Sequence, residues 1–200
     1  TQDSGGVSGD GGISDLTGIE YFTALTTLDC SYNSGLTGIP TSTLTNLTIL
    51  NIANCTSVSA IDLSTCSNLT SLTAEGCTSL KTIDASGCPE LTFLDADYSG
   101  VEIVNVNGCT KITTLSNLQL YSTNSLVELY AQGVPAISGS GLSFDGRSTL
   151  EVIDFSGCTD MTTLDLSNCP ALKTVNLSGC TNLATLNLTD STAITDLNIS

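Results

Sequence analysis

Residues 150–182 read LEVIDFSGCTD, MTTLDLSNCPA and LKTVNLSGCTN, three consecutive copies of one phrase. Each copy gives an aliphatic residue, two variable residues, an aliphatic residue, Asp or Asn, an apolar residue, Ser, a small or polar residue, and Cys. Copies of the phrase begin at Leu47, Val58, Leu69, Leu80, Leu91, Leu150, Met161, Leu172, Leu183 and Ile194. A short, fixed period, here of about 11 residues, indicates a stacked architecture in which each repeat buries its apolar side against its neighbours.

The apolar residues at positions 4 and 6 of the phrase, such as Leu164 and Leu166, are two residues apart. This is the alternation of a β-strand with both side chains pointing inward. Position 5 is Asp or Asn in nearly every copy, and because these residues form strands poorly, we expect it to be a solvated outer face. The residues at position 5 include Asp62, Asp84, Asp95, Asn105, Asp154, Asp165 and Asn176. The Ser-Gly-Cys segments that follow are predicted turns.

One phrase is too short to circle a core, whereas two phrases make a coil of about 22 residues, a usual length for one turn of a repeat solenoid. We therefore predict a mainly-β, right-handed repeat solenoid of about seven or eight coils, with parallel strands on two opposite sides and little helix. Strands stacked ~4.8 Å apart would give a body roughly 35 Å long. Residues 13–200 form the predicted solenoid, and residues 1–12 form a flexible Gly/Ser/Asp linker. Because the sequence starts without Met and stops in mid-phrase, we expect it to be part of a longer protein.

The phrase resembles the signature of leucine-rich repeat proteins, L-x-x-L-x-L-x-x-N with N or C in the ninth place. Residues 25–33, LTTLDCSYN, match this pattern with Asn33 in the ninth place. Residues 13–25, ISDLTGIEYFTAL, look like the entry segment of Bacteroidetes-type surface leucine-rich repeat proteins, and the chain is also similar to cysteine-bearing internalins. The resemblance implies an exported protein, secreted or at the cell surface, that acts by binding. The chain departs from the common pattern because both half-coils have the strand phrase.

Eight of the nine cysteines occupy position 9 of the phrase, whereas Cys30 lies at position 6, an inward position. The eight are Cys55, Cys66, Cys77, Cys88, Cys109, Cys158, Cys169 and Cys180. Partners two phrases apart, such as Cys55 and Cys77, would stack in the same orientation, and parallel Cβ vectors fit disulfide geometry poorly. We therefore predict a reduced structural ladder in which Cys replaces the Asn of the family pattern as a small buried donor. Disulfides remain an alternative, and a metal site is another, although the chain has no His and no CxxC.

Composition narrows the function classes. Four basic and 20 acidic residues give a net charge of −16, which opposes binding to nucleic acid or to anionic membranes. No apolar run is long enough for a membrane span, so we expect no membrane insertion. Without His, the chain lacks Ser-His-Asp and Cys-His nucleophile systems, and we expect neither enzyme activity nor a cofactor. Calcium between stacked Asp62 and Asp84 is an alternative to two solvated carboxylates.

Residues 112–149 break the register: the phrase headed by Ile112 is three residues too long and the phrase headed by Ile137 two too long. Extra residues in a solenoid go to loops on one face, often the binding face. The candidate binding residues in this segment are Tyr121, Tyr130, Phe144 and Arg147, the last being the only Arg. Ile49 and Phe93 are a second candidate contact, because they interrupt the outward Thr/Ser row at position 3 two coils apart.

The sequence therefore predicts a monomeric, exported bacterial scaffold for protein recognition or adhesion at the cell surface. Recognition of glycans on the Thr/Asn/Asp sheet face, with Tyr121 or Tyr130 as the stacking platform, is the main alternative. A purely structural stalk is another alternative. Decay of the repeat without any function is the competing interpretation of residues 112–149.

Overall fold

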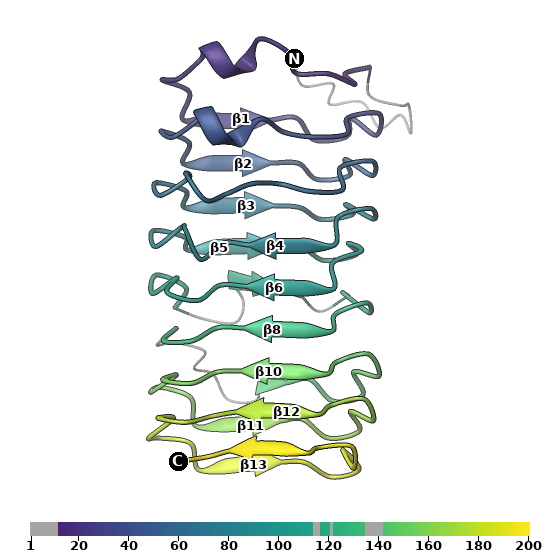
Figure 1. Ribbon diagram of the computed structural model, residues 1–200, viewed down its shortest axis with the longest axis vertical. Helices are drawn as coiled ribbons and strands as arrows, with labels where there is room; N and C mark the ends of the chain where they lie inside the picture. The colour runs from purple at the N-terminus through teal and green to yellow at the C-terminus, as the bar shows by residue number, and fades with distance from the viewer. Residues whose placement is uncertain (1–11, 114–116, 121, 135–141) are drawn as a thin grey trace.

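The computed structural model describes residues 12–113, 117–120, 122–134 and 142–200 of the chain. The described residues form a stack of flat coils, with the N-terminus at one end of the stack and the C-terminus at the other (Figure 1). The strands are β1 (Thr27–Asp29), β2 (Ile49–Asn51), β3 (Ser71–Thr73), β4 (Thr82–Asp84), β5 (Phe93–Asp95), β6 (Ile103–Asn105), β7 (Leu118–Gln119), β8 (Glu128–Tyr130), β9 (Leu142–Ser143), β10 (Val152–Asp154), β11 (Thr163–Asp165), β12 (Thr174–Asn176), β13 (Thr185–Asn187) and β14 (Asp196–Asn198). Two 3-10 turns, η1 (Ile19–Tyr21) and η2 (Thr41–Thr43), are the helical elements described in full.

The strands lie on two opposite faces of the stack, and from β3 onward successive strands alternate between them. One face is a single six-stranded parallel sheet in the order β14-β12-β10-β8-β6-β4, which we call the continuous sheet. The other face consists of a five-stranded sheet, β1-β2-β3-β5-β7, and a three-stranded sheet, β13-β11-β9, and we call it the divided face. The predicted β-solenoid, with parallel strands on two sides and little helix, is confirmed.

The core lies between the two faces and is built from positions 4 and 6 of the phrase. Register partners such as Leu50, Leu72 and Leu94 stack along the divided face with side chains that are fully buried. Position 6 is equally buried, and it varies in size from Ala74 to Phe155. The predicted inward positions are therefore confirmed along the length of the core, whereas in the last coil Leu197 and Ile199 are exposed.

The Asp/Asn row at position 5 faces outward as predicted, but it is more than a solvated row. Asp165 Oδ1 accepts hydrogen bonds from the Ser167 N–H at 3.0 Å and from the Ser167 hydroxyl at 2.6 Å. The same arrangement joins Asp62 to Ser64, and Asn176 accepts the Ser178 N–H. Asp and Asn side chains favour such turns because they bond to the backbone two residues on. Where position 5 is Asp or Asn, the side chain therefore ends the strand and opens the turn.

The extra residues of the irregular segment are absorbed on the way to the divided face. The continuous sheet pairs Ile103 with Glu128 and Glu128 with Val152, partners that lie further apart in the sequence than Val152 and Thr174, the partners of a regular coil. Val134 and Leu142 enclose one insertion, and Cys109 and Leu118 the other, just before β9 and β7. The continuous sheet therefore passes the interruption with its pairing intact, and the divided face breaks between β7 and β9.

In the described part of the chain no helix has the length and apolar character needed to cross a membrane. Residues 1–11 of the predicted linker lie outside the described residues.

Candidate functional site

The outward side of the continuous sheet changes character where it passes the irregular segment. Regular coils present Thr, Asp and Asn there, whereas β6, β8 and β10 and the residue before β8 present Ile103, Tyr130, Val152 and Val127. The register places Ile103 and Val152 on either side of Glu128, and places Tyr130 between Asn105 and Asp154. All four apolar side chains are partly exposed. We call these four residues the β8 patch.

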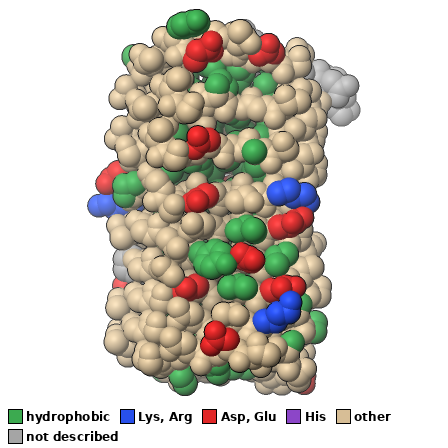
Figure 2. Space-filling model, in the orientation of Figure 1, with side chains coloured by type: hydrophobic (Ala, Val, Ile, Leu, Met, Phe, Trp, Pro, Cys, Tyr) green, Lys and Arg blue, Asp and Glu red, His purple; other side chains and the backbone are tan. Residues whose placement is uncertain are grey.

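Charged and amide side chains surround the β8 patch and are fixed in place. Lys81 Nζ donates to Glu102 and Lys173 Nζ donates to Glu151, each at 2.7 Å. Figure 2 shows green apolar side chains in the middle of this face, with red acidic and blue basic side chains around them. Such exposed pairs contribute little to stability. They place charged groups beside the apolar side chains of the patch.

Hydrogen bonds also fix the polar groups inside the patch. The Tyr130 hydroxyl donates to Glu128 Oε2 at 2.8 Å, and the Gln132 amide donates to Asp154 Oδ2 at 2.7 Å. Burial and the neighbouring Glu128 carboxylate raise the pKa of Tyr130, so its hydroxyl remains a donor at neutral pH. Burial acts to raise the pKa of Asp154, but hydrogen bonds from the Ser156 N–H and from Gln132 and Asn176 lower it below its ordinary value. The Asp154 carboxylate beside Tyr130 is therefore charged at neutral pH, and hydrogen bonds hold both side chains in place.

The predicted binding residues are not all in one place. Tyr130 lies in the β8 patch, on the regular part of the sheet and not on a loop. Ile49 and Phe93 lie on the divided face with Ser71 between them, Ile49 being 43% exposed and Phe93 partly buried. Tyr121 lies outside the described residues. Ile49 and Phe93 therefore point outward on one face, as predicted, but they are separate from Tyr130.

Phe144 was predicted as a contact residue, and this is wrong. It occupies position 6 of its coil, is only 6% exposed, and its ring centroid lies 5.9 Å from that of Phe155. An inward ring packed on another ring contributes to the core. It is not available to a partner.

Arg147 was expected to be available to a ligand, and this is also wrong. It occupies position 9 of its coil, where the following coils have Cys158 and Cys169. Its guanidinium donates to the Leu120 carbonyl at 2.7 Å and to the Thr123 carbonyl at 2.7 Å. Burial lowers the pKa of Arg147, a group that remains charged at neutral pH.

The position-9 cysteines line the inside of the turns, and all nine cysteines have free thiols in the structure. The Cys77 thiol donates to the Ile52 carbonyl at 3.0 Å and the Cys158 thiol to the Ala131 carbonyl at 3.2 Å. Each acceptor is position 6 of the preceding coil on the same face. The thiols with the same type of acceptor are those of Cys55, Cys88, Cys109, Cys169 and Cys180, while Cys66 is buried in the equivalent place.

This geometry explains why the position tolerates other donors. Ser191 donates to the Leu166 carbonyl and accepts the Cys169 N–H, and Arg147 makes the equivalent bond to Leu120. Burial raises the pKa of Cys77, Cys88, Cys109 and Cys158 to about 12, which keeps them protonated as donors at neutral pH. The reduced state of the ladder in solution remains a prediction.

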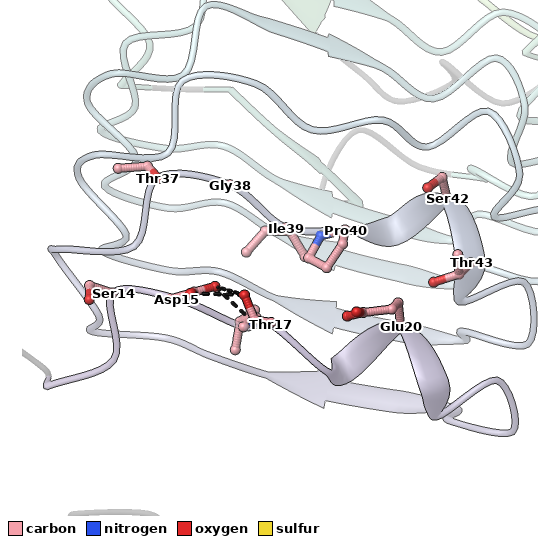
Figure 3. A pocket seen from close by; sticks show the side chains of 11 residues that line it. Ser14, Asp15, Thr17, Glu20, Thr37, Gly38, Ile39, Pro40, Ser42 and Thr43 are labelled. Atoms are coloured by element: carbon pink, nitrogen blue, oxygen red, sulfur yellow. Dashed lines mark hydrogen bonds between the residues drawn. The ribbon is translucent and has the colours of Figure 1, made fainter.

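An open cavity of about 610 Å³ lies between the entry segment and the first half-coil (Figure 3). Its two carboxylates are already engaged: Asp15 accepts the Thr17 N–H at 2.8 Å, and Glu20 accepts the Gly18 N–H at 2.7 Å. These bonds shape the backbone of the entry turn. Both carboxylates therefore have a structural role in the entry turn, and no ligand is needed to explain them.

The described residues contain no group of three or more His, Cys, Asp or Glu side chains placed to hold a metal ion. Asp62 and Asp84 each bond to their own turn, through Ser64 and Ser86. Calcium between stacked carboxylates, the alternative raised by the sequence, has no site among the described residues.

The sequence reasoning did not identify Val127 and Val152 as contact residues. Ile103 interrupts the outward Thr/Ser row at position 3, and Val152 does the same two coils further on. The relation was hidden because the insertions changed the spacing. Placing the extra residues before the strands of one face would have aligned Ile103, Glu128 and Val152.

Comparison with solved structures returns leucine-rich repeat proteins. The functional domain of InlJ from Listeria monocytogenes, described as including a cysteine ladder, is 20% identical with a TM-score of 0.30; the match covers 95% of this chain and 54% of that one. A leucine-rich repeat protein from Bacteroides ovatus is 16% identical with a TM-score of 0.30, over 88% of this chain and 61% of that one. A complex of TLR13 with ssRNA13 is 21% identical with a TM-score of 0.35, over 86% of this chain and 25% of that one.

The chain spans about half the length of the InlJ structure. No protein-family model matches the chain, and a search of curated protein sequences finds no match either. The architecture itself is established by the strand register described above.

Proposed function

We propose that this chain is a protein-recognition scaffold and that the β8 patch is its contact surface. The observation that supports this most is the local change on the continuous sheet, where apolar side chains replace Thr and Asn over three adjacent strands. An apolar centre inside a polar rim is the arrangement of protein interfaces. A Tyr at the centre with a fixed hydroxyl is a residue type that often dominates binding energy.

The rim indicates the chemistry of the partner. Glu102, Glu151 and Asp154 lie around the apolar side chains, and Glu128 lies between Ile103 and Val152. Lys81 and Lys173 are already paired with Glu102 and Glu151. The surface is therefore acidic in a chain whose net charge is −16. Charge complementarity favours a partner with an apolar centre and a basic margin. The same charge disfavours nucleic acid, whose phosphates require neutralisation by Lys and Arg.

Site-specific photo-crosslinking tests the proposal. A benzoylphenylalanine residue at Val152 should yield a discrete crosslinked protein from a surface extract, while the same residue at Ile49 on the divided face should not. The purified partner should then lose at least about tenfold in affinity when Ile103 and Val152 are replaced by Glu. Equal crosslinking at the two positions, or full affinity of the double variant, would contradict the assignment.

We also propose that the protein acts outside the cell, secreted or at the cell surface, where a binding scaffold of this composition would meet its partner. The support is the resemblance of its phrase to surface leucine-rich repeat proteins. Fractionation of the source bacterium with an antibody against this domain tests it. Recovery in the cytoplasmic fraction alone would contradict it.

A further inference from the structure

The turns that follow β1, β2, β3 and β5 lie one above another along one edge of the divided face (Figure 1). Their tips place four residues in a row, which we call the tyrosine row: Tyr32, Asn54, Gly76 and Tyr98. The row is held by the backbone, because the N–H of each of the first three donates to the carbonyl of the next coil, at 2.7, 2.7 and 2.9 Å. All four have positive φ angles, of 60°, 59°, 69° and 56°.

The two tyrosines are costly at these places. A left-handed backbone suits Gly, Asn and Asp, and it is unfavourable for a bulky side chain. Elsewhere the same turn position with positive φ is filled by Gly, Asn or Asp, at Gly108, Gly133, Gly146, Gly157, Asn168, Gly179 and Asp190. Tyr32 and Tyr98 are nevertheless 68% and 65% exposed, so burial does not compensate for the strain. Backbone strain retained in a residue that does not support the core indicates a use for its side chain.

The residues between the rings form a low, polar floor. A Cβ atom added at Gly76 would lie 2.6 Å from Asn54 Oδ1, so the Asn54 side chain extends over the Gly76 backbone. The rings project from coils three steps apart, a separation of about 14 Å at the usual strand spacing. Glu75 and Asp97 flank the floor at the preceding turn position, and both are partly exposed. A ligand that contacts both rings must therefore be extended and narrow.

The chemistry of the row favours a sugar chain over a peptide strand. An added peptide strand pairs through main-chain groups, and here the N–H groups of Tyr32, Asn54 and Gly76 and the carbonyls opposite them are already bonded to each other. The recognition groups at the row are two aromatic ring faces, an amide and two carboxylates. A sugar ring has an apolar face that stacks on an aromatic ring and a rim of hydroxyls that bond to amides and carboxylates. The carboxylates disfavour an acidic sugar.

We propose that the tyrosine row is a binding site for an uncharged oligosaccharide, which stacks on Tyr32 and Tyr98 and hydrogen-bonds to Asn54 between them. The site is separate from the β8 patch and does not depend on the protein-recognition function. The two tyrosines are kept at a cost in stability because their rings bind the ligand, a trade that functional sites commonly show.

The test is a panel of neutral oligosaccharides of increasing length, with uronic-acid oligosaccharides and arginine-rich peptides as comparison probes, measured against the full chain. Wild type should bind a neutral oligosaccharide long enough to reach both rings, and the Tyr32→Gly/Tyr98→Gly double variant should lose about tenfold or more in affinity. The matched control is Tyr21→Ala, which removes a tyrosine that is 83% exposed away from the row and should bind as wild type does.

A second readout distinguishes loss of a binding ring from loss of fold. Because Gly relieves the left-handed strain, the double variant should melt at the same temperature as wild type or higher. Failure of every neutral oligosaccharide to bind wild type would overturn the proposal, as would unchanged binding by the double variant. Tyr-dependent binding of the arginine-rich peptides, without sugar binding, would assign the row to a basic protein instead.

Discussion

The two faces of the solenoid are built from the same phrase, yet they respond differently to the same interruption. On the divided face the extra residues come just before β7 and β9, and the sheet ends at these strands. On the continuous sheet β8 pairs with β6 and β10 in full register. The β8 patch lies on the sheet that remained unbroken. An insertion in a solenoid can therefore be absorbed on one side and leave the opposite side as a rigid surface, so the irregular sequence does not itself mark the contact.

The largest expected effect is on the buried position-4 side chains, which both faces contribute to the core. Leu164→Ala on the divided face and Ile153→Ala on the continuous sheet should each lower the free energy of unfolding by ~2–5 kcal/mol through lost burial and a cavity. Both side chains are at most 1% exposed. Urea melts measure the effect. A cost below that of an outward substitution such as Val152→Ser would mean that the inward and outward positions are reversed.

Replacing Arg147 tests whether this residue stabilises the fold or binds a partner. Arg147→Ala removes a charged donor from the Leu120 and Thr123 carbonyls, which keep only the Thr123 hydroxyl and N–H and the Leu126 N–H. We expect a loss of about 2–3 kcal/mol in the free energy of unfolding, because hydrogen bonds from charged groups are the stronger ones. Binding to a partner of the β8 patch should be unchanged at temperatures where the variant is folded. Lys111→Ala, at an exposed position, is the matched control for removing a positive charge. A variant that is as stable as wild type but no longer binds the partner would show that Arg147 is a contact residue after all.

These contrasts show where sequence reasoning reached its limit. The period predicted the coil, the two strand faces and the inward place of Leu164, because side-chain alternation along a strand fixes them. It could not predict that Arg147 bonds to Leu120, because that depends on where the inserted residues are accommodated. For the same reason Val152 was not aligned with Ile103, and Phe144 was placed outside the core. The Asx turn at Asp165 was missed because outward exposure and a local hydrogen bond are compatible.

The cysteine ladder makes the stability of the fold depend on pH. The folded-state pKa of Cys88 and Cys158 is about 12, above the ordinary value of 9.0. Because the folded pKa is the higher one, the stabilisation is fully present below pH 9 and is lost as pH rises toward 12. At pH 10 each of these thiols should lower the free energy of unfolding by about 1 kcal/mol relative to neutral pH. Urea midpoints at neutral pH and at pH 10 measure the loss.

The control is Cys88→Ala/Cys158→Ala, whose stability should fall less steeply between neutral pH and pH 10 than that of wild type. If stability fell equally with pH in both proteins, the thiols would not be the cause of the pH dependence. Alkylation of denatured, unreduced protein should also label all nine cysteines, and recovery of disulfide-linked pairs would contradict a reduced ladder.

The smallest effect is expected at the strand ends. Asp165→Asn should change the free energy of unfolding by no more than about 0.5 kcal/mol, because Asn makes the same bond to the turn at Asn176. Asp165→Ala, which removes the acceptor of the Ser167 N–H, should cost about 1 kcal/mol. Equal stability of the two variants in urea melts would show that the turn bond contributes nothing.

The account depends most on the continuity of the sheet through β8, and amide hydrogen exchange followed by NMR tests this directly. The N–H groups of Val106, Glu128 and Ala131 donate across the interruption, to Tyr130, Glu102 and Asp154 at 2.8, 3.0 and 2.8 Å. They should exchange as slowly as the Phe155 amide of a regular coil, while the Ser143 amide of β9, at the break in the divided face, should exchange faster. Exchange of Glu128 and Ala131 as fast as that of Ser143 would contradict a continuous sheet and, with it, a rigid β8 patch.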